Sequence, residues 1–394
     1  MKRIKIGLVG KPNVGKSTIF SAITKTPAEI GNYPFTTIKP NLGITFIEHP
    51  CPETELGQKC NPKEGTCING TRMIPVEIID VPGLIPGASE GKGMGNEFLD
   101  NIRDVDAILH VYDASGKTTA DGNPSTEHID PSEEIAFIKE ELVNWIASRL
   151  SRDWEKFARK ADSTSDRIEA KLMPKVGAFG LKERDIETIL IKEVFPARLS
   201  IWKDEDFVSF ASAIFRYVKP IVHLGNKTDD LSPAEIERLS GITENNFLVS
   251  GLFEMAMARA LASGIISSPD MPLEAKPGLK DAQKDAIARI NAFFNIPHTS
   301  RIGKVISGIV YGLLHYIVVF PVYDEGKWCD REGNILPDAF LMRDGSNALD
   351  LAFSVHTEIG EGFIRAINGR TRMVVSKEHQ LKDSDVIKIV TRRT

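Results

Sequence analysis

The stretch that decides the fold of this chain is GKPNVGKS, at residues 10–17. The apolar run before it, residues 4–9, predicts a buried strand, and residues 18–23 after it predict the start of a helix. A glycine-rich loop in this setting can bind phosphate, because its backbone N–H groups and the positive end of the helix dipole point at the phosphate oxygens. The stretch therefore predicts a nucleoside triphosphate site, and the competing interpretation is an ordinary glycine-rich turn.

Each position in this loop has an expected task. Gly10 and Gly15 allow the backbone to curl around the phosphates. Lys16 would reach the β and γ phosphates as a catalytic cation, and Ser17 would place its hydroxyl on Mg²⁺. The expected nucleotide-binding residues of this segment are Gly10, Pro12, Asn13, Val14, Gly15, Lys16, Ser17 and Thr18.

The composition limits the class of protein. With 394 residues the chain is long for a single core and suggests two or three domains. A hydrophobic content of 42% with 26% charged residues is that of an ordinary soluble protein. The net charge of -5 gives no overall attraction to nucleic acid, so an RNA contact would need a local basic patch, and we expect no DNA partner.

Neither a targeting segment nor a membrane span is expected. The N-terminus passes directly into the first predicted strand, without the apolar segment of a signal peptide. Residues 305–322 contain no Asp, Glu, Lys or Arg and match a membrane helix in length. Their glycines, proline and β-branched end favour a buried helix end followed by a strand. We therefore expect a cytoplasmic protein that does not bind membranes.

Two later segments would complete the phosphate site. Thr37 lies where a GTPase supplies a hydroxyl to Mg²⁺ when the γ-phosphate is present, and Thr36 is the alternative. Residues 74–79 predict a strand that ends at Asp80, whose carboxylate could hold Mg²⁺ through water. The N–H of Gly83 could then sense the γ-phosphate. Thr37 and Gly83 join Lys16 as the expected catalytic residues.

The residue after this motif raises a question about catalysis. Leu84 stands where many GTPases have the glutamine that orients the attacking water. An aliphatic side chain cannot do this, so hydrolysis must depend on another group, a bound cation or a partner. The glycine-rich segment that continues to residue 95 predicts a switch that the γ-phosphate orders, or else a plain surface loop.

A base-recognition motif follows the strand predicted at residues 220–224. The Asp229 carboxylate can accept hydrogen bonds from guanine N1–H and from its exocyclic amine, whereas adenine has no amine there, and such a mismatch is worth roughly 10⁴-fold. Asn226 would tie the motif to the phosphate loop, and Lys227 would pack along the base. Backbone N–H groups further along would meet the base O6. The expected base-side residues are Asn226, Lys227, Asp229, Ser250 and Gly251.

These residues lie in longer segments that resemble the Obg-related translation-factor GTPases, close to the YchF group and its archaeal and eukaryotic relatives. The matching segments are KPNV at 11–14, NYPFTT at 32–37 with Pro40-Asn41, and DVPGL at 80–84 leading into GASEGKG at 87–93. The resemblance covers essentially the whole chain. It implies an α/β P-loop NTPase domain, with a mostly parallel sheet and helices on both faces, plus a helical insertion and a C-terminal ubiquitin-like β-grasp module, the TGS domain.

The resemblance also bears on the cofactors. In that family an apolar residue replaces the usual glutamine, as Leu84 does here. Asn13 matches a position that helps to hold a monovalent cation in some related GTPases, so K⁺ is a candidate ligand beside the expected GTP or GDP and Mg²⁺. One feature departs from the pattern. YchF itself carries a different base-recognition motif and accepts ATP, whereas residues 226–229 have the guanine form.

We expect three domains. The GTPase domain would take residues 1–127 and 217–303, the helical insertion residues 128–216, and the TGS domain residues 304–394. A cap motif at residues 130–133 starts the insertion, and helical spacing resumes at 183–191 and 206–215 as an antiparallel arm. Its basic residues would face solvent or contact RNA, and they are Arg152, Lys156, Arg159 and Lys160.

The C-terminal ninety residues change to short strands with turn signals. The predicted strands lie at 317–322, 339–342, 373–375 and 386–390, and the predicted helix lies at 349–355. Whether this module binds nucleic acid through the basic residues between 365 and 377, or instead binds protein, stays open.

Three of the four cysteines lie close together in the sequence, in a Pro- and Gly-rich insert. Cys51, Cys60 and Cys67 could form a tetrahedral zinc site with His49. The spacing lacks Cys-x-x-Cys pairs, so free cysteines are favoured, with zinc second and a disulfide last in a reducing compartment.

The sequence thus predicts a monomeric switch that hydrolyses GTP to GDP and phosphate and acts on a ribosome or an RNA partner. The first alternative is an ATPase of the YchF type. The second is a ribosome- or RNA-binding module that nucleotide stabilises, with little turnover. Guanine selectivity separates the first two hypotheses, and stimulation of turnover by ribosomes or K⁺ separates the first from the third.

Overall fold

The structure is a computed structural model, and it describes residues 3–24, 42–81, 102–119 and 122–392. Two compact units form. The phosphate-loop unit comprises Lys5–Ile23 and Ile79–Ile302, and the C-terminal unit comprises Met1–Ile4, Thr24–Ile78 and Gly303–Thr394. Each unit is described by itself.

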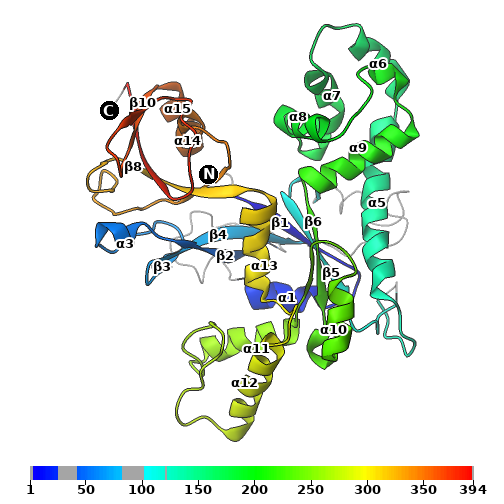
Figure 1. Cartoon of the computed structure of the whole chain (residues 1–394), viewed down its shortest axis with the longest axis vertical. Helices are drawn as coiled ribbons and strands as arrows, with labels where there is room; N and C mark the ends of the chain where they lie inside the picture. Colours follow the sequence, from blue (N-terminus) through cyan, green and yellow to red (C-terminus); the bar gives the residue numbers. More distant parts are fainter. Residues whose placement is uncertain (1–2, 25–41, 82–101, 120–121, 393–394) are drawn as a thin grey trace. The chain divides into compact units, whose positions relative to one another are not determined.

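The phosphate-loop unit is built on four parallel strands in the order β1-β5-β6-β7 (Figure 1). Strand β5 is buried along its whole length, as expected for a parallel strand covered on both faces. The registers pair Leu8 with Leu109 and His110 with His223, so the carboxyl ends of these strands, where the expected nucleotide residues follow, lie at one edge. The strand bounds are β1 Lys5–Val9, β5 Ala107–Asp113, β6 Ile221–Asn226 and β7 Asn246–Leu248.

Among the residues of this unit that the structure describes, four α-helices follow or flank the strands, and five make up a separate helical segment. Within that segment α5 packs against α9 around Leu142, Phe207 and Phe210. Trp154 stacks on Trp202 with ring centroids 5.3 Å apart. The first group is α1 Lys16–Ile23, α10 Pro233–Ser240, α11 Gly251–Ala262 and α12 Asp281–Phe294. The second is α5 Pro131–Ser151, α6 Trp154–Asp162, α7 Ile168–Val176, α8 Glu183–Lys192 and α9 Asp204–Tyr217. Short 3₁₀ turns occur at η2 Gly177–Phe179, η3 Leu199–Ile201 and η4 Thr228–Asp230.

The predicted start of the helical segment is present. Pro131 is the first residue of α5, and the Asp130 carboxylate caps the helix by accepting from Ser132 N at 3.0 Å. The helical patterns expected at 183–191 and 206–215 are α8 and α9.

The C-terminal unit carries a five-stranded mixed sheet in the order β11-β10-β12-β8-β9. Its central pair, β12 and β8, is parallel, and α14 packs on the sheet around Leu351, Phe340 and Ile387. This is the predicted β-grasp fold, although β10 was missed by the sequence patterns. Its elements are η5 Gly308–Leu313, a π-helix, then β8 Tyr316–Val322, β9 Phe340–Arg343, α14 Ala348–Val355, α15 Thr357–Glu361, β10 Phe363–Asn368, β11 Val374–Val375 and β12 Asp385–Thr391.

The remaining part of the C-terminal unit lies earlier in the chain. Strand β2 (Leu42–Pro50) lies beside β4 (Thr71–Asp80), which continues across the boundary at Ile78, and β3 (Thr66–Ile68) pairs antiparallel with β4. A single helical turn, α3 (Glu53–Leu56), follows β2.

The apolar span at residues 305–322 is not one helix. It contains the end of α13 (Ile302–Ser307), the π-helix η5 and strand β8, as the favoured interpretation predicts. Across the described ranges, no helix combines the length and the hydropathy that a bilayer crossing requires.

Candidate nucleotide site

The phosphate loop curls at two positions where only glycine fits. Gly10 has a φ of +151°, and a Cβ there would lie 2.2 Å from Val111 O. Gly15 has a φ of +99°, and a Cβ there would lie 2.2 Å from Asn226 Nδ2. L side chains rarely adopt such φ values. The two glycines therefore give the loop both its curl and its close contact with the neighbouring strands.

Lys16 begins α1 and folds back over the loop. Its Nζ donates to Gly10 O at 2.7 Å and to Lys11 O at 2.8 Å. Burial lowers the pKa of Lys16, against the opposing effect of the negative charges on Asp80 and Glu134. A partly desolvated ammonium held by neutral carbonyls gains free energy from an anion. The Lys16 ammonium is thus suited to bind a phosphate group.

Asp80 ends β4 with one oxygen unpaired. Its Oδ1 is buried and has no hydrogen-bond partner among the described residues. Burial raises the pKa of Asp80, and the charge on Lys16 opposes that shift. A buried carboxylate oxygen without a donor is complementary to a cation or to a metal-bound water, so the residues here fit Mg²⁺. Ser17 is exposed in the first turn of α1, while Thr37 and Gly83 lie outside the described residues.

Asn226 joins the phosphate loop to the base-recognition motif. Its Nδ2 donates to Val14 O at 2.8 Å, and its Oδ1 accepts from Gly251 N at 2.8 Å. The side chain is almost fully buried. One amide therefore fixes three loops that lie far apart in the sequence.

Asp229 is oriented by the loop after β7. Its Oδ1 accepts from Ser250 Oγ at 2.7 Å, and Ser250 also caps α11 by accepting from Phe253 N at 3.1 Å. Because the Gly251 N–H donates to Asn226 and the Ser250 hydroxyl donates to Asp229, both residues position the motif in this structure. Their contact with the base O6 stays a prediction.

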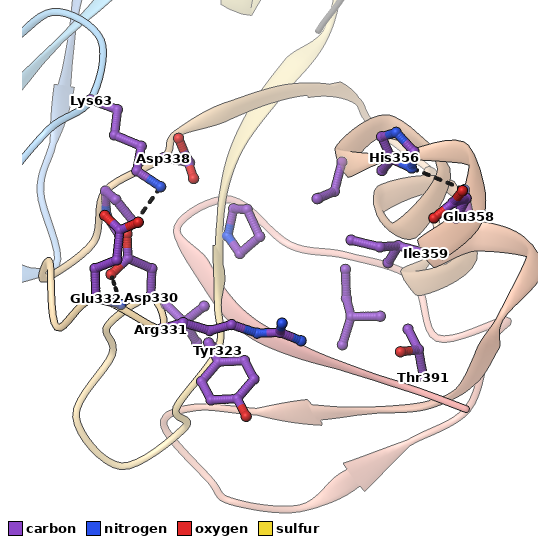
Figure 2. A pocket seen from close by; sticks show the side chains of 15 residues that line it. Lys63, Tyr323, Asp330, Arg331, Glu332, Asp338, His356, Glu358, Ile359 and Thr391 are labelled. Atoms are coloured by element: carbon purple, nitrogen blue, oxygen red, sulfur yellow. Dashed lines mark hydrogen bonds and ion pairs between the residues drawn. The ribbon is translucent and has the colours of Figure 1, made fainter. Parts of the chain in front are cut away.

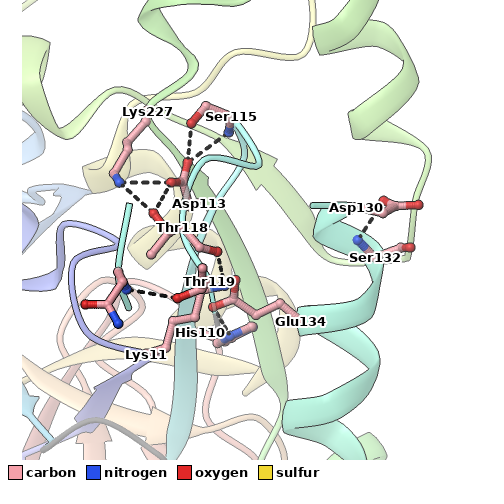
Figure 3. Close-up of polar contacts among 12 residues, drawn as sticks. Lys11, His110, Asp113, Ser115, Thr118, Thr119, Asp130, Ser132, Glu134 and Lys227 are labelled. Carbon is pink, nitrogen blue, oxygen red and sulfur yellow. Dashed lines mark hydrogen bonds and ion pairs between the residues drawn. The ribbon is translucent and has the colours of Figure 1, made fainter. Parts of the chain in front are cut away.

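Lys227 makes contacts that the sequence did not suggest. Its Nζ donates to Asp113 Oδ2 at 2.9 Å and to Thr118 Oγ1 at 3.2 Å (Figure 3). Burial disfavours the charged form of Asp113, but hydrogen bonds from Ser115, Thr118 and Lys227 outweigh it and lower the pKa of this carboxyl. The buried carboxylate at the end of β5 thereby holds the lysine at the carboxyl edge of the sheet.

A second ion pair links the phosphate loop to α5. Lys11 Nζ lies 2.9 Å from Glu134 Oε2, both side chains are 11% exposed, and Figure 3 shows the two pointing at each other beside His110. Lys11 Nζ also donates to Thr118 O at 2.8 Å. Burial raises the pKa of Glu134, against the opposing effect of Lys11. The signal for this pair was available in the sequence: Glu134 falls between Pro131 and Ile138 on the apolar face of the helix.

Two buried histidines, on the neighbouring strands β5 and β6, contact each other within the sheet. His110 Nδ1 and His223 Nδ1 are 3.0 Å apart on paired strands. Burial lowers the pKa of His110 well below its usual range, and burial together with Lys139 lowers the pKa of His223 to about 4. Both rings are neutral at pH 7, one donating and the other accepting.

The cysteine insert, residues 51–70, corrects one expectation. His49 does not join the three cysteines, because its Nε2 lies 2.9 Å from Asp383 Oδ2 and its Nδ1 lies 2.8 Å from Pro50 O. The fourth group beside the thiols is a carboxylate, Glu53, which the spacing of the cysteines does not indicate.

Comparison with known proteins places these features in a family. Models described as "50S ribosome-binding GTPase", "Obg-like GTPase YGR210-like, G4 motif-containing domain" and "TGS domain" match residues 5–173, 224–324 and 332–391. An uncharacterized GTP-binding protein of Methanocaldococcus jannaschii is 44% identical over 391 residues, and the match covers 98% of each chain. The protein named "Ribosome-binding ATPase YchF" of Buchnera aphidicola is 29% identical over 370 residues, covering 92% of this chain and 87% of that protein.

A solved structure agrees with the assignment. The GTP binding protein from Pyrococcus horikoshii OT3 matches with a TM-score of 0.78 and 35% identity, covering 98% of this chain and 100% of that one. Its similarity extends over both units, so it includes the TGS domain as well as the phosphate loop. The chain belongs to the YchF-type, Obg-like family of GTP-binding proteins, with a P-loop GTPase domain and a C-terminal TGS domain.

Proposed function

We propose that this protein binds GTP with Mg²⁺, hydrolyses it to GDP and phosphate, and works as a molecular switch. The observation that carries the proposal is a pair of hydrogen bonds formed by the Asn226 amide, which donates to Val14 O and accepts from Gly251 N. They fasten the guanine-type motif to the phosphate loop, so that one nucleotide can meet both.

Asp229 is the proposed reader of the base. A carboxylate has about four lone-pair sites, so the bond from Ser250 leaves room for the N1–H and the amine of guanine. Adenine would leave those sites unpaired. This favours GTP over the ATP that the YchF-named relatives are described as hydrolysing.

The proposed phosphate chemistry rests on five residues of this chain. Lys16 binds the β and γ phosphates, while Ser17, Thr37 and Asp80 would hold Mg²⁺. The metal, when bound, neutralises charge that develops on the phosphate oxygens. Gly83 would sense the γ-phosphate through its N–H.

Leu84 cannot orient the attacking water, so turnover by this chain alone should be slow. Asn13 is a candidate ligand for a cation that would compensate for the missing glutamine. Its Nδ2 donates to Gly122 O at 2.8 Å, which leaves Oδ1 as the atom for a K⁺ ion beside the phosphates.

A ribosome or an RNA is the proposed partner, and the name of the YchF relatives supports the ribosome. The four basic residues on or just before α6 and the TGS domain are the candidate contact surfaces. We retain the division into a GTPase domain at 1–127 and 217–303, an insertion at 128–216 and a TGS domain at 304–394 for a monomer acting in the cytoplasm.

Equilibrium binding of GDP, a GTP analogue, ADP and an ATP analogue tests the proposal. Asp229→Asn should lower GDP affinity by about 10²-fold or more, because one acceptor is replaced by an amide donor. The same variant should gain affinity for xanthosine diphosphate, whose extra carbonyl accepts from that amide. Asp230→Asn, a change at the exposed neighbouring carboxylate, is the matched control and should bind GDP like the wild type.

The rival hypotheses make opposite predictions in the same assays. Equal or tighter binding of ADP by the wild type would establish the ATPase hypothesis in place of the switch. Turnover that neither ribosomes nor exchange of Na⁺ for K⁺ accelerates would favour a nucleotide-stabilised binding module.

A further inference from the structure

Three thiols and a carboxylate converge in the cysteine insert. Cys51 follows β2, Glu53 starts α3, Cys60 lies in the loop after it, and Cys67 lies on β3. Their four ligand atoms all lie within 4.8 Å of one another. Four separate positions along the insert thus point at one centre.

Two distances within this group match those between ligands of one metal ion. A tetrahedral Zn²⁺ with bonds of about 2.3 Å to sulfur and 2.0 Å to oxygen places two sulfurs roughly 3.8 Å apart, and a sulfur and an oxygen roughly 3.5 Å apart. Cys51 Sγ lies 3.8 Å from Cys60 Sγ, and Cys67 Sγ lies 3.3 Å from Glu53 Oε1. A disulfide would need sulfurs about 2.05 Å apart. We propose that Cys51, Glu53, Cys60 and Cys67 bind a Zn²⁺ ion.

The surroundings fix the carboxylate as a ligand. Glu53 Oε2 accepts from Cys60 N at 2.7 Å, and Oε1 accepts from Gly70 N at 3.1 Å. Such bonds to ligating carboxylates orient them and raise metal affinity. Binding would release the three thiol protons to solvent.

Arg72 balances the charge of the site. Three thiolates and a carboxylate around Zn²⁺ leave a net charge of about −2. The Arg72 side chain is almost fully buried, and its guanidinium donates to Cys60 Sγ at 3.3 Å. The same guanidinium donates to Leu336 O at 2.9 Å and to Pro337 O at 3.0 Å. Arg72 therefore connects Cys60 to residues 336–337, near the start of the segment that matches the TGS domain.

Further hydrogen bonds connect the cysteine insert to the same segment around residues 335–337. Asn61 N donates to Ile335 O at 2.8 Å, and Lys63 N donates to Pro337 O at 2.9 Å. Lys63 Nζ pairs with Asp330 at 3.0 Å on the rim of a groove of about 590 Å³ (Figure 2). A metal that fixes the loop around Cys60 would therefore also hold this segment in place.

Metal analysis of the full-length protein tests the proposal. Protein purified under reducing conditions without chelator should contain one zinc per chain. After exchange with Co²⁺ it should show the visible bands of a tetrahedral cobalt site and a thiolate charge-transfer band. Cys67→Ser should remove about a third of that band, because one of three thiolates is lost. Cys329→Ser changes the fourth cysteine, which lies outside the group, and should leave metal content and spectrum unchanged.

A second variant keeps all the thiols. Glu53→Gln should retain the charge-transfer band at saturating Co²⁺ while weakening zinc affinity roughly 10-fold or more. Hydrogen exchange at the amides of Asn61 and Lys63 should be slower in the zinc-bound protein than after chelation.

The results that would overturn the site are equally definite. They are a reduced full-length protein that gives no tetrahedral cobalt spectrum, a Cys51–Cys60 disulfide in the protein as purified, or equal loss of metal in Cys329→Ser. None of these readouts depends on nucleotide hydrolysis, so their failure would leave the proposed function untouched.

Discussion

The phosphate loop and the cysteine insert both bring together polar atoms that suit a charged ligand, but they do so by different means. The loop uses eight consecutive residues, and its main contacts come from backbone curled at Gly10 and Gly15. The insert uses side chains from four positions spread between Cys51 and Cys67. The phosphate loop can thus be recognised from a short continuous sequence. The grouping of side chains in the cysteine insert depends on how the chain folds back on itself.

This difference explains which features could be foreseen. A backbone site needs a fixed spacing of glycines, which a sequence displays directly. A side-chain site needs only that the ligand atoms meet, and many spacings satisfy this. Glu53, two residues after Cys51, was therefore overlooked as a ligand, and the zinc alternative named His49 as the fourth group instead.

The largest expected effect lies in the phosphate loop. Lys16→Ala should reduce GTP turnover by about 10²–10³-fold, because it removes the cation that would stabilise charge on the phosphates. Single-turnover hydrolysis at saturating nucleotide measures the change. Lys284→Ala, at an exposed position of α12, should retain wild-type turnover. A Lys16→Ala protein with wild-type rate would mean that the loop only holds nucleotide.

The next effect concerns the sheet that supports the loop. The pKa of His223 is lowered to about 4 in the folded protein, against 6.5 in the unfolded chain, so the unfolded state binds the proton more tightly between these values. The stability that this neutral ring contributes is present above pH 6.5 and is lost as the pH falls toward 4, by about 3 kcal/mol. Urea unfolding at a series of pH values measures the loss.

His223→Gln should flatten that acid dependence, since an amide can donate and accept beside His110 without titrating. If wild type and variant lose stability in parallel between pH 6.5 and pH 4, His223 is not the group responsible for the loss.

The smallest effect belongs to the C-terminal unit. Arg370 forms a two-pronged ion pair with Glu55, with both contacts at 2.7 Å, but the Glu55 side chain is 48% exposed. Solvent screening limits such a pair, so Glu55→Gln should lower stability by about 0.5 kcal/mol at most. Denaturant titration of the zinc-loaded protein measures it. A loss above about 2 kcal/mol would mean that this pair, rather than the proposed metal and Arg72, holds the insert in place.

Much of the architecture could be predicted because its signals are local. The strands at residues 107–112 and 220–224 are apolar runs, and α5 has its cap and its periodic apolar face. Strand β10 was missed because Arg365 and Asn368 interrupt its pattern and only Ala366 is fully buried. It is formed by pairing with β12, which a local pattern does not reveal.

The motifs of the candidate site could be recognised in the sequence, but most of the side-chain contacts that hold these motifs in place could not. Asn226 was expected to tie the base motif to the phosphate loop, and it does so through Val14 O. The partners Asp113 and Glu134 were not expected. Asp113 is an ordinary carboxylate in the sequence, and although Glu134 falls on the apolar face of α5, its partner Lys11 is brought near only by the fold.

The Asn226 bridge has a consequence for the order of events during synthesis. Asn226 and Val14 are separated by 212 positions. A growing chain that has already displayed its phosphate loop, and even the whole helical segment, still lacks the amide that braces the loop and the carboxylate of Asp229, the proposed reader of the base. On the proposed function, such a nascent chain selects guanine only after Ser250 and Gly251 have also emerged. Nucleotide selectivity would then report folding of the phosphate-loop unit, and not of residues 303–394, which are synthesised later.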